Sequence, residues 1–300
     1  MQADDWFLTS ELFSEDERPG ITDFLATCRC RTAAIFHDAI PLRYSQITWP
    51  QSVARHPGYM KLLAHFDRVW AVSAASRDEL VGFWKWQGLE ETPPVEVLAL
   101  GADFIGQMRV TGSGAEARGP VLLSVGILEP RKNQALLLDA AEVLWREGVK
   151  FELHLVGRVN PHFGKPLVAR VQKLAGKFSG LRYHAAADDA AVAALYARAR
   201  VSLFPTIAEG CGLPLLESLW QGVPCVCSDL PVLRENSDGG GCLAVAVNDP
   251  TAWTEALRRV LTDDALVARL KREAGERPLP TWAAAAKTLR GALSSRLRAS

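Results

Sequence analysis

The sequence predicts an α/β protein built on parallel sheets, and three observations lead to this. From about Gly119 onward, short apolar runs alternate with helical patterns. These runs are apolar at nearly every position, as expected of strands that are covered on both faces. Glycines such as Gly126 and Gly157 directly follow run ends. Ligands of parallel sheets bind outside the carboxyl ends of the strands, so residues at these positions are the first candidates for a site.

The apolar runs and helical patterns place the elements as follows. Strands are expected at 6–9, 33–37, 69–72, 95–98, 121–125, 151–156, 181–184, 201–205, 224–228 and 242–247. Helices are expected at 132–147, 166–178, 188–199, 214–221 and 229–236, with a closing helix at 281–297 led by Pro280. In the more fragmentary first hundred residues, Ser76-Arg77-Asp78-Glu79 has the form of a capping box that opens a helix.

The length of 300 residues allows two domains of ordinary size. A polar, Gly- and Ser-rich stretch begins at Thr111 and is typical of a linker. We therefore expect a shortened N-terminal domain at 1–110, a linker at 111–118, a larger domain at 119–278 and a closing helix at 279–300.

Composition excludes several classes of function. Apolar residues make up 48% and charged residues 23% of the chain, as in soluble globular proteins. Lys plus Arg and Asp plus Glu number 34 each, so nothing suggests nucleic-acid binding. The six cysteines fit neither a CxxC redox motif nor the usual zinc spacing, which favours reduced thiols in a cytosolic protein.

The location expected from the sequence is cytoplasmic. No apolar run has the length of a bilayer span, and the acidic N-terminus is unlike a signal peptide. Arg290, Arg296 and Arg298 on the closing helix leave peripheral contact with the inner face of the membrane open. A solvated basic helix end is the simpler explanation of these arginines.

The stretch 203–218 carries the strongest functional signal. A strand ending at Phe204 leads into a loop with Glu209, Gly210 and Gly212, after which Pro214 opens a helix. The glycines let backbone N–H groups approach a ligand closely, and the positive end of a helix suits phosphate. A carboxylate in the loop and a second one in the helix can accept from sugar or ribose hydroxyls. The alternative is that these acidic residues only favour the helix dipole.

This stretch, Phe-Pro-x-x-x-Glu-Gly-x-Gly-Leu-Pro-x-x-Glu, resembles the signature of the retaining glycosyltransferases of family four, in their mannosyltransferase-like branch. Three further stretches resemble that family in the right order. Residues 125–133 (Val-Gly-Ile-Leu-Glu-Pro-Arg-Lys-Asn) are similar to its diphosphate-gripping loop, and residues 35–41 (Ile-Phe-His-Asp-Ala-Ile-Pro) to its His-Asp strand end. Residues 100–103 (Leu-Gly-Ala-Asp) are similar to the crossing between its domains. The similarity runs from about residue 30 to the C-terminus.

The resemblance implies a GT-B-like fold of two Rossmann-like domains with parallel sheets, the first one shortened. The closing helix is then expected to pack back toward the N-terminal domain. In that family the first domain begins with a strand and a Gly-rich turn beside the acceptor cleft, and both are expected to be missing here. We therefore expect nucleoside diphosphate binding but weak transfer by the isolated chain, unless a partner or self-association covers the exposed sheet edge.

The resemblance also implies roles for individual residues. The catalytic set is expected to be His37, Lys132, Arg131 and Glu209. The substrate-binding set is expected to be Gly126, Arg131, Lys132, Gly210, Gly212, Leu213 and Glu217. Ile127 stands where many members have an arginine, so Arg131 is expected to supply part of that charge. Cations at a helix start oppose its dipole, which favours a compensating anion over two merely solvated side chains.

The implied reaction moves a hexose, mannose from GDP-mannose as the first candidate, to a polysaccharide, a glycolipid or another glycan acceptor. Configuration is expected to be retained through same-face substitution that the leaving diphosphate assists. No cofactor and no metal are expected, because Arg131, Lys132 and a helix N-terminus take the place of a cation. The alternatives are a UDP-sugar donor, a catalytically weak nucleotide-binding or scaffolding subunit of a glycan-assembly complex, and a GT-B epimerase or phosphorylase.

Overall fold

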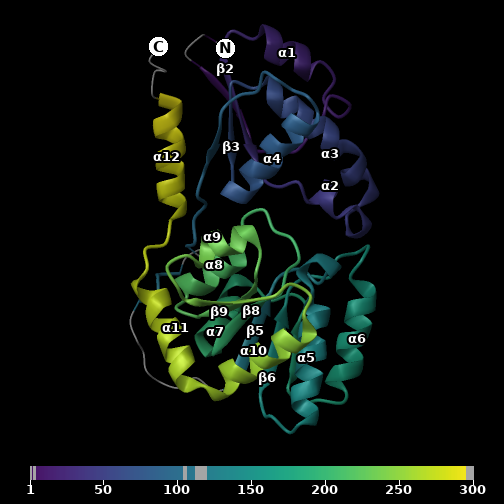
Figure 1. The fold of residues 1–300 in the computed structure, drawn as a ribbon, viewed down its shortest axis with the longest axis vertical. Helices are drawn as coiled ribbons and strands as arrows, with labels where there is room; N and C mark the ends of the chain where they lie inside the picture. The colour runs from purple at the N-terminus through teal and green to yellow at the C-terminus, as the bar shows by residue number, and fades with distance from the viewer. Residues whose placement is uncertain (1, 3–4, 104–106, 112–119, 295–300) are drawn as a thin grey trace. The chain divides into compact units, whose positions relative to one another are not determined.

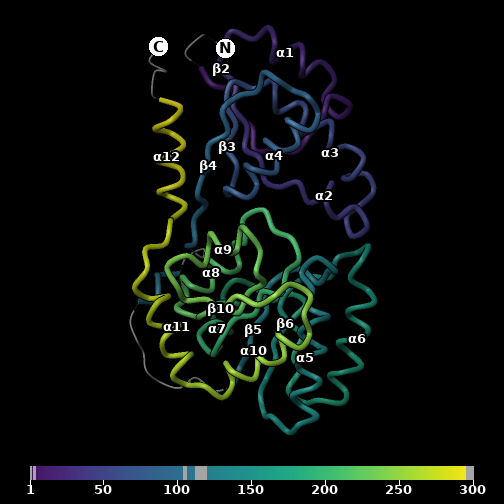
Figure 2. Tube along the Cα trace, viewed as in Figure 1, coloured from purple at the N-terminus to yellow at the C-terminus, as the bar shows by residue number. Residues whose placement is uncertain are grey.

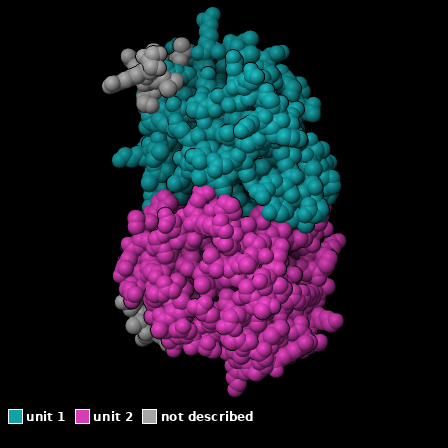
Figure 3. Space-filling model, viewed as in Figure 1, with its two compact units in different colours: residues 1–100, 209–211, 281–300 teal, residues 101–208, 212–280 magenta. Residues whose placement is uncertain are grey.

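The computed structural model describes residues 2, 5–103, 107–111 and 120–294. Residues 112–118 of the expected linker, and Arg296 and Arg298 of the closing helix, lie outside the described residues. The chain divides into two compact units (Figure 3). Unit 1 comprises residues 1–100, 209–211 and 281–300, and unit 2 comprises residues 101–208 and 212–280.

Unit 2 is built on a six-stranded parallel sheet with the strand order β10-β9-β8-β5-β6-β7. Its strands are β5 (Val121–Val125), β6 (Glu152–Val156), β7 (Leu181–His184), β8 (Val201–Phe204), β9 (Cys225–Ser228) and β10 (Cys242–Val245). The helical elements are η3 (Pro130–Lys132), α5 (Gln134–Arg146), α6 (Lys165–Ala175), α7 (Asp189–Arg198), α8 (Leu213–Trp220), α9 (Pro231–Ser237), α10 (Pro250–Thr262) and α11 (Asp264–Glu276). Figure 2 shows the trace of these elements.

The central strands of this sheet are buried on both faces, as their largely apolar runs predict. Successive residues of a strand point to opposite faces. Leu122 accordingly joins the large core cluster that α5, α6 and α10 form on one face. Its neighbour Leu123 packs with Leu195 and Tyr196 of α7 on the other face. Five of the six strands were expected within one residue of both observed ends, and β10 starts as expected but ends two residues early, at Val245.

Unit 1 has a four-stranded parallel sheet with the order β1-β2-β3-β4. Its strands are β1 (Trp6–Thr9), β2 (Arg31–Phe36), β3 (Arg68–Ala71) and β4 (Val95–Val97). Its helical elements are α1 (Ile21–Thr27), α2 (Ile40–Arg43), η1 (Ser45–Ile47), α3 (Pro50–Leu62), η2 (Leu63–His65), α4 (Ala74–Trp86) and α12 (Trp282–Ser294). The smaller first sheet agrees with the expected fold class.

Helix α12 covers one face of the unit 1 sheet (Figure 1). Ala285 is buried there with Trp70 and Leu98, and further apolar side chains of α12 pack against the same cluster. The indole N–H of Trp6 donates to the carbonyl of Leu293 at 2.7 Å, which ties β1 to the end of the helix. The C-terminal segment therefore completes the core of unit 1.

The start of α4 differs from the sequence prediction. The helix begins at Ala74, and its N-cap is Ser73, whose hydroxyl accepts from the N–H of Ser76. The expected capping box at Ser76-Arg77-Asp78-Glu79 is therefore wrong by three residues. The Glu79 carboxylate instead accepts from the N–H of Ala39 and pairs with a neighbouring arginine. Two serines three residues apart gave two possible registers, and the buried contacts of Ser73 decide between them.

Candidate active site

The carboxyl edge of the unit 2 sheet holds a topological switch point between β5 and β8. From β5 the chain proceeds to β6 and β7 on one side, and from β8 to β9 and β10 on the other. Crevices at such points bind ligands in open α/β sheets. Gly126 follows β5, and residues 205–208 follow β8. Because β5 and β8 are paired, the loops that carry the two strongest sequence motifs leave neighbouring strands at the same edge of the sheet.

Two glycines bring the turns after β5 and β6 into backbone contact. Gly126 has φ 152° and Gly157 has φ 146°, which side-chain-bearing residues rarely adopt. The N–H of Gly126 donates to the carbonyl of Val156 at 2.8 Å. A Cβ on Gly157 would lie 2.1 Å from the carbonyl oxygen of Gly126. Both positions therefore require glycine. The backbone of Val156 and Gly157 supports the Gly126 turn.

Lys132 lies at the end of η3 beside these turns. Its ammonium nitrogen is 4.9 Å from the centroid of the Phe204 ring, within the range of a cation–π interaction. Its methylene stem passes 3.8 Å from where a Cβ on Gly126 would stand. Its charge also acts on Glu217, whose pKa it lowers. The structure thus brings together three predicted site residues, Gly126, Lys132 and Glu217.

The Glu217 carboxyl on α8 is half-buried, and burial raises its pKa more than Lys132 lowers it. Helix α8 begins at Leu213, with Gly212 as its N-cap at φ 79°. A Cβ on Gly212 would lie 2.6 Å from the Leu233 side chain, so the residue is restricted both in φ and in space. No side chain caps this end of α8. Pro214 has no N–H, and the N–H of Leu215 donates to the carbonyl of Gly212 at 3.1 Å.

Arg131 is engaged differently from Lys132. Its guanidinium pairs with Glu129 through Nε at 3.0 Å and Nη2 at 2.8 Å. Its Nη1 donates to the carbonyl of Ala208 at 3.0 Å, and its own carbonyl accepts from the N–H of Ile207 at 2.9 Å. Arg131 therefore braces the segment after β8. Sequence reasoning missed Glu129 in this role, although it lies two residues from Arg131 in the same motif.

Unit 1 contains the other predicted residues, beginning with His37 just after β2. Its Nε2 lies 3.0 Å from the carbonyl oxygen of Ser10. A carbonyl oxygen only accepts, so Nε2 carries a proton and donates it in this contact. Asp38 has a local role, since its carboxylate accepts from the N–H of Ile40 at 2.9 Å.

Residues 209–211 are part of unit 1, and their backbone packs directly on the end of β2. A Cβ on Gly210 would lie 2.3 Å from the carbonyl oxygen of His37. The Ser73 hydroxyl donates to the carbonyl of Gly210 at 2.7 Å, and the Ser76 hydroxyl lies 2.8 Å from the carbonyl oxygen of His37. Two predicted segments, His37 and Glu209–Gly210, are thus joined through two serines that the sequence did not single out.

His56 of α3 supports the same strand end. It is fully buried, and its Nε2 donates to the carbonyl of Asp38 at 2.9 Å. Burial lowers its pKa to about 4, so the ring is neutral at neutral pH. Tyr59, one turn further along α3, donates to the carbonyl of Ile35 at 3.3 Å.

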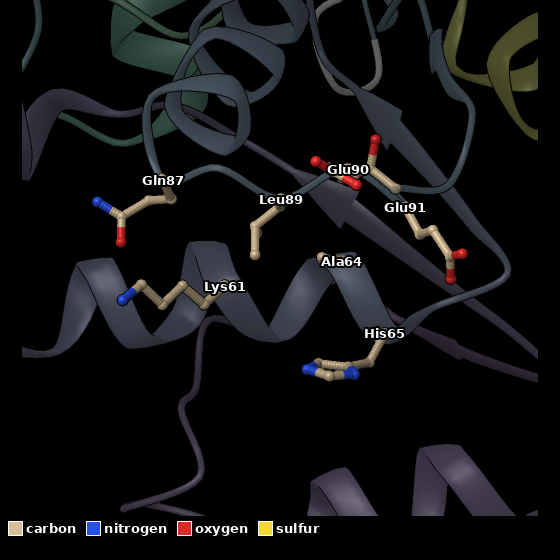
Figure 4. A pocket seen from close by; sticks show the side chains of 8 residues that line it. Lys61, Ala64, His65, Gln87, Leu89, Glu90 and Glu91 are labelled. Atoms are coloured by element: carbon tan, nitrogen blue, oxygen red, sulfur yellow. The ribbon is translucent and has the colours of Figure 1, made fainter.

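Two cavities lie away from these residues. One, of about 820 Å³, is in unit 1 and is lined by Lys61 and His65 together with Gln87, Glu90 and Glu91 (Figure 4). The other, of about 830 Å³, is near the amino ends of β5, β6 and β7 in unit 2. None of the predicted site residues lines either cavity.

Within the described ranges, no group of three or more His, Cys, Asp or Glu side chains is arranged to hold a metal ion. The helices in the part of the chain that the structure describes are all too short or too polar to cross a bilayer.

Comparison with known proteins supplies the family. Residues 112–277 match the family described as "Glycosyl transferases group 1". The chain is 32% identical over 225 residues to the "Serotype-specific mannosyltransferase WbdA" of Escherichia coli. That alignment covers 67% of this chain and 26% of the relative, so the chain spans about a quarter of the relative's length.

Two further likenesses concern the donor and the fold. A "GDP-mannose-dependent alpha-(1-6)-phosphatidylinositol dimannoside mannosyltransferase" of Mycobacterium tuberculosis is 34% identical over 148 residues, covering 47% of this chain and 35% of the relative. The solved structure of a sucrose-phosphate synthase from Thermosynechococcus elongatus superposes with a TM-score of 0.71 at 20% identity, covering 90% of this chain and 69% of that one. With the two parallel sheets, this likeness confirms the expected GT-B-like fold class.

Proposed function

Because the chain belongs to the glycosyl transferases group 1, with a family match over more than half its length, we propose that it transfers mannose from GDP-mannose to a glycan or lipid-linked acceptor. The named activities of its relatives, a serotype-specific mannosyltransferase and a GDP-mannose-dependent mannosyltransferase, support this donor. The single observation that carries the proposal is the meeting of Lys132, Glu217 and the Gly126 turn at one end of the unit 2 sheet.

In this proposal the diphosphate of the donor binds at the carboxyl edge of the unit 2 sheet. Lys132 neutralises its charge, and the positive end of the α8 dipole attracts its oxygens. The Gly126 turn lets the backbone approach the ligand without a side chain in the way. Glu217 accepts from the ribose hydroxyls, for which a half-buried carboxylate is well suited. Arg131 supplies part of the cationic field while it braces the segment after β8.

The sugar is transferred with retention of configuration. As the glycosidic bond breaks, negative charge develops on the departing phosphate oxygen, and Lys132 stabilises it without a metal ion. The acceptor hydroxyl attacks on the same face and loses its proton to the leaving diphosphate. Glu209 and His37 orient the transferred hexose and its acceptor.

The proposal is tested first by binding. Thermal shift of the whole chain with GDP, GDP-mannose, UDP and UDP-glucose should show the largest rise in melting temperature with the GDP ligands. A ligand at a hundred times its Kd adds about 2.7 kcal/mol to the stability of the native state. A larger shift with the uridine ligands would indicate a UDP-sugar donor instead of GDP-mannose. No shift with any of the four at millimolar concentration would contradict the nucleotide site.

Turnover is tested next, by NMR of the products of GDP-mannose with candidate glycan and lipid-linked acceptors. Formation of an α-linked product from the α-linked donor, unaffected by EDTA, is the expected result. A β-linked product would exclude retention. A chain that binds GDP-mannose tightly yet neither transfers nor hydrolyses its sugar would be the nucleotide-binding subunit instead.

A further inference from the structure

Side chains donate hydrogen bonds to the backbone carbonyls at the end of β2, where a neighbouring strand would do so inside a sheet. Strand β1 pairs with β2 only as far as Ala34, and among the described residues no strand continues this pairing beyond it. Side chains supply the donors instead. Tyr59 donates to the carbonyl of Ile35, and His56 to that of Asp38. The carbonyl between them, that of His37, faces the N-terminus of α4.

At the N-terminus of α4, Ser73 and Ser76 face two backbone carbonyls. The Ser73 oxygen is 2.7 Å from the carbonyl oxygen of Gly210 and 3.0 Å from the Ser76 oxygen. The Ser76 oxygen is 2.8 Å from the carbonyl oxygen of His37 and 3.0 Å from that of Gly210. Ser73 is 5% exposed and Ser76 is 1% exposed, so water is not a substitute partner.

Counting protons selects one arrangement. Each hydroxyl carries a single proton, and each carbonyl oxygen can only accept. In one arrangement Ser73 donates to the carbonyl of Gly210 and Ser76 to that of His37. Each hydroxyl then uses the shorter of its two possible contacts, and both carbonyls have a donor. If Ser76 donated to Gly210 instead, the carbonyl of His37 would lose this donor. A buried carbonyl without a partner is costly, so the first arrangement is favoured.

The backbones of Gly210 and His37 are packed too closely for a side chain to fit between them. The missing Cβ of Gly210 would stand 2.3 Å from the His37 oxygen and 3.0 Å from the Cβ of Asp38. The two backbones are therefore in direct contact, and the two hydroxyls fix their separation. Glu209 and His37, which the sequence predicts to act on the sugar, directly adjoin the two carbonyls that the serines hold.

We propose that Ser73 and Ser76 are positioning residues for sugar transfer. Their hydroxyl groups donate to the carbonyls of Gly210 and His37 and hold these two backbone segments at a fixed distance. This fixes the position of Glu209 relative to the His37 ring. This inference rests on the proposed function, because it assigns the orientation of two residues of that same site. The serines belong to unit 1, whereas Lys132 and Glu217, which are assigned to the nucleotide, belong to unit 2. We therefore expect nucleotide binding to be independent of the serines.

The test separates this role from helix capping. Ser73→Asp keeps an oxygen that accepts from the N–H of Ser76 but has no proton to donate to Gly210. Ser76→Ala leaves the cap oxygen of Ser73 in place and removes the donor to His37. Both variants should lower kcat by about tenfold or more, since small misplacements of reacting groups have such effects. The Kd for GDP should stay within twofold. Ser73→Thr, which can both cap and donate, should restore kcat.

A matched control is Asp263→Ala, which removes the N-cap of α11 in unit 2. It should lower the melting temperature and leave kcat unchanged. If Ser73→Asp and Ser76→Ala keep the wild-type kcat, the proposal is overturned. It is also overturned if their loss of kcat is matched by an equal loss of GDP affinity, because a general structural defect would do that.

A second readout does not depend on catalysis. Hydrogen–deuterium exchange of the peptide spanning residues 205–213 should be at least about tenfold faster in Ser73→Asp and in Ser76→Ala, because local opening governs exchange. Unchanged exchange would overturn the proposal even if activity fell. If the wild-type chain neither binds GDP nor transfers a sugar, the proposed function fails, and the exchange result alone decides whether the serines hold this segment.

Discussion

At the scale of single residues, the neighbouring cations Arg131 and Lys132 differ in how their charge is met. Arg131 is paired with Glu129 through two nitrogens and is 22% exposed. Lys132 instead lies over the face of Phe204 and acts on the carboxyl of Glu217. Its position beside the Gly126 turn places the Lys132 charge among the other groups assigned to the donor. Lys132 is therefore the stronger candidate for leaving-group stabilisation.

Lys132→Ala is expected to lower kcat by about tenfold or more while the fold stays intact, since one such charged contact is worth roughly 2–4 kcal/mol in the transition state. Steady-state kinetics at saturating GDP-mannose measures this. Lys150→Ala is the matched control, because Lys150 is an exposed lysine near the amino edge of the same sheet. Equal activity of wild type and Lys132→Ala at saturating donor would remove Lys132 from the mechanism.

Glu217→Gln is expected to raise stability and weaken nucleotide binding. Burial raises the pKa of Glu217 above its ordinary value. For a carboxyl with a raised folded-state pKa, stability is highest at low pH and is lost as pH rises through that pKa. A neutral amide should therefore raise the melting temperature at pH 7, while the Kd for GDP increases by about tenfold through the lost charged hydrogen bonds.

Glu209→Gln is the companion variant and should mainly lower kcat, since Glu209 is assigned to the sugar. Calorimetry with GDP and steady-state kinetics on both variants separate the two roles. The reverse pattern, with Glu209→Gln weakening GDP binding and Glu217→Gln lowering only kcat, would mean that the two assignments are exchanged.

At the scale of elements, α3 makes unit 1 sensitive to acid. His56 is neutral in the folded state with a pKa of about 4, against an ordinary value of 6.5. Because its pKa is lower in the folded state, His56 binds a proton more readily in the unfolded chain. Its contribution to the unfolding free energy is therefore complete above pH 6.5 and is lost as pH falls toward 4. The loss should reach about 3 kcal/mol over that window, at 1.36 kcal/mol for each unit of pKa.

Urea unfolding of wild type and His56→Gln between pH 7.5 and pH 4.5 tests this. The glutamine amide can still donate to the Asp38 carbonyl but does not titrate. The difference in unfolding free energy between the two proteins should therefore shift in favour of the variant as pH falls. Parallel pH profiles would show that His56 does not control the acid sensitivity.

The backbone contact between the turns after β5 and β6 makes a second prediction for elements. Gly157→Ala would place a Cβ 2.1 Å from the Gly126 carbonyl oxygen at a φ of 146°. We expect a loss of several degrees in melting temperature together with weaker GDP binding, because the Gly126 turn must move. In the control Gly176→Ala, the nearest atom lies at 3.6 Å and φ is −70°, so both properties should stay near wild type. Normal GDP binding by Gly157→Ala would exclude the Gly126 turn from the donor site.

The sequence predicted elements well where burial on both faces made a run continuously apolar. Strands β5 and β8, each with a single serine among apolar residues, are close to this pattern. Helices α10 and α11 were not expected, although Asp249 and Asp263 cap them at their N-termini. Their signal is amphipathic and interrupted by polar residues, so it is weaker than that of the strands. The start of α4 could not be read from local pattern, because its N-cap is fixed by contacts with distant residues.

At the scale of the whole molecule, the predicted site residues divide between the two units. Gly126, Arg131, Lys132 and Glu217 belong to unit 2, whereas His37 and Glu209 belong to unit 1. The sequence predicts these as site residues because their motifs are local. It could not supply the pairing of Arg131 with Glu129 or the contact of Gly210 with His37. The second of these joins segments more than 170 positions apart, which no local pattern reveals.

This division leads to a last prediction, on His37→Ala. Transfer should fall by about a hundredfold, the lower range for loss of a side chain that exchanges or shares a proton near the reacting centre. The Kd for GDP should stay within twofold, because the groups assigned to the diphosphate and ribose belong to unit 2. Lys132→Ala should instead lower both transfer and GDP affinity. The control His65→Ala replaces an exposed histidine of unit 1 and should match wild type. Calorimetry with GDP and transfer assays on the three variants measure both quantities, and a parallel loss of GDP affinity in His37→Ala would show that donor binding depends on unit 1 as well.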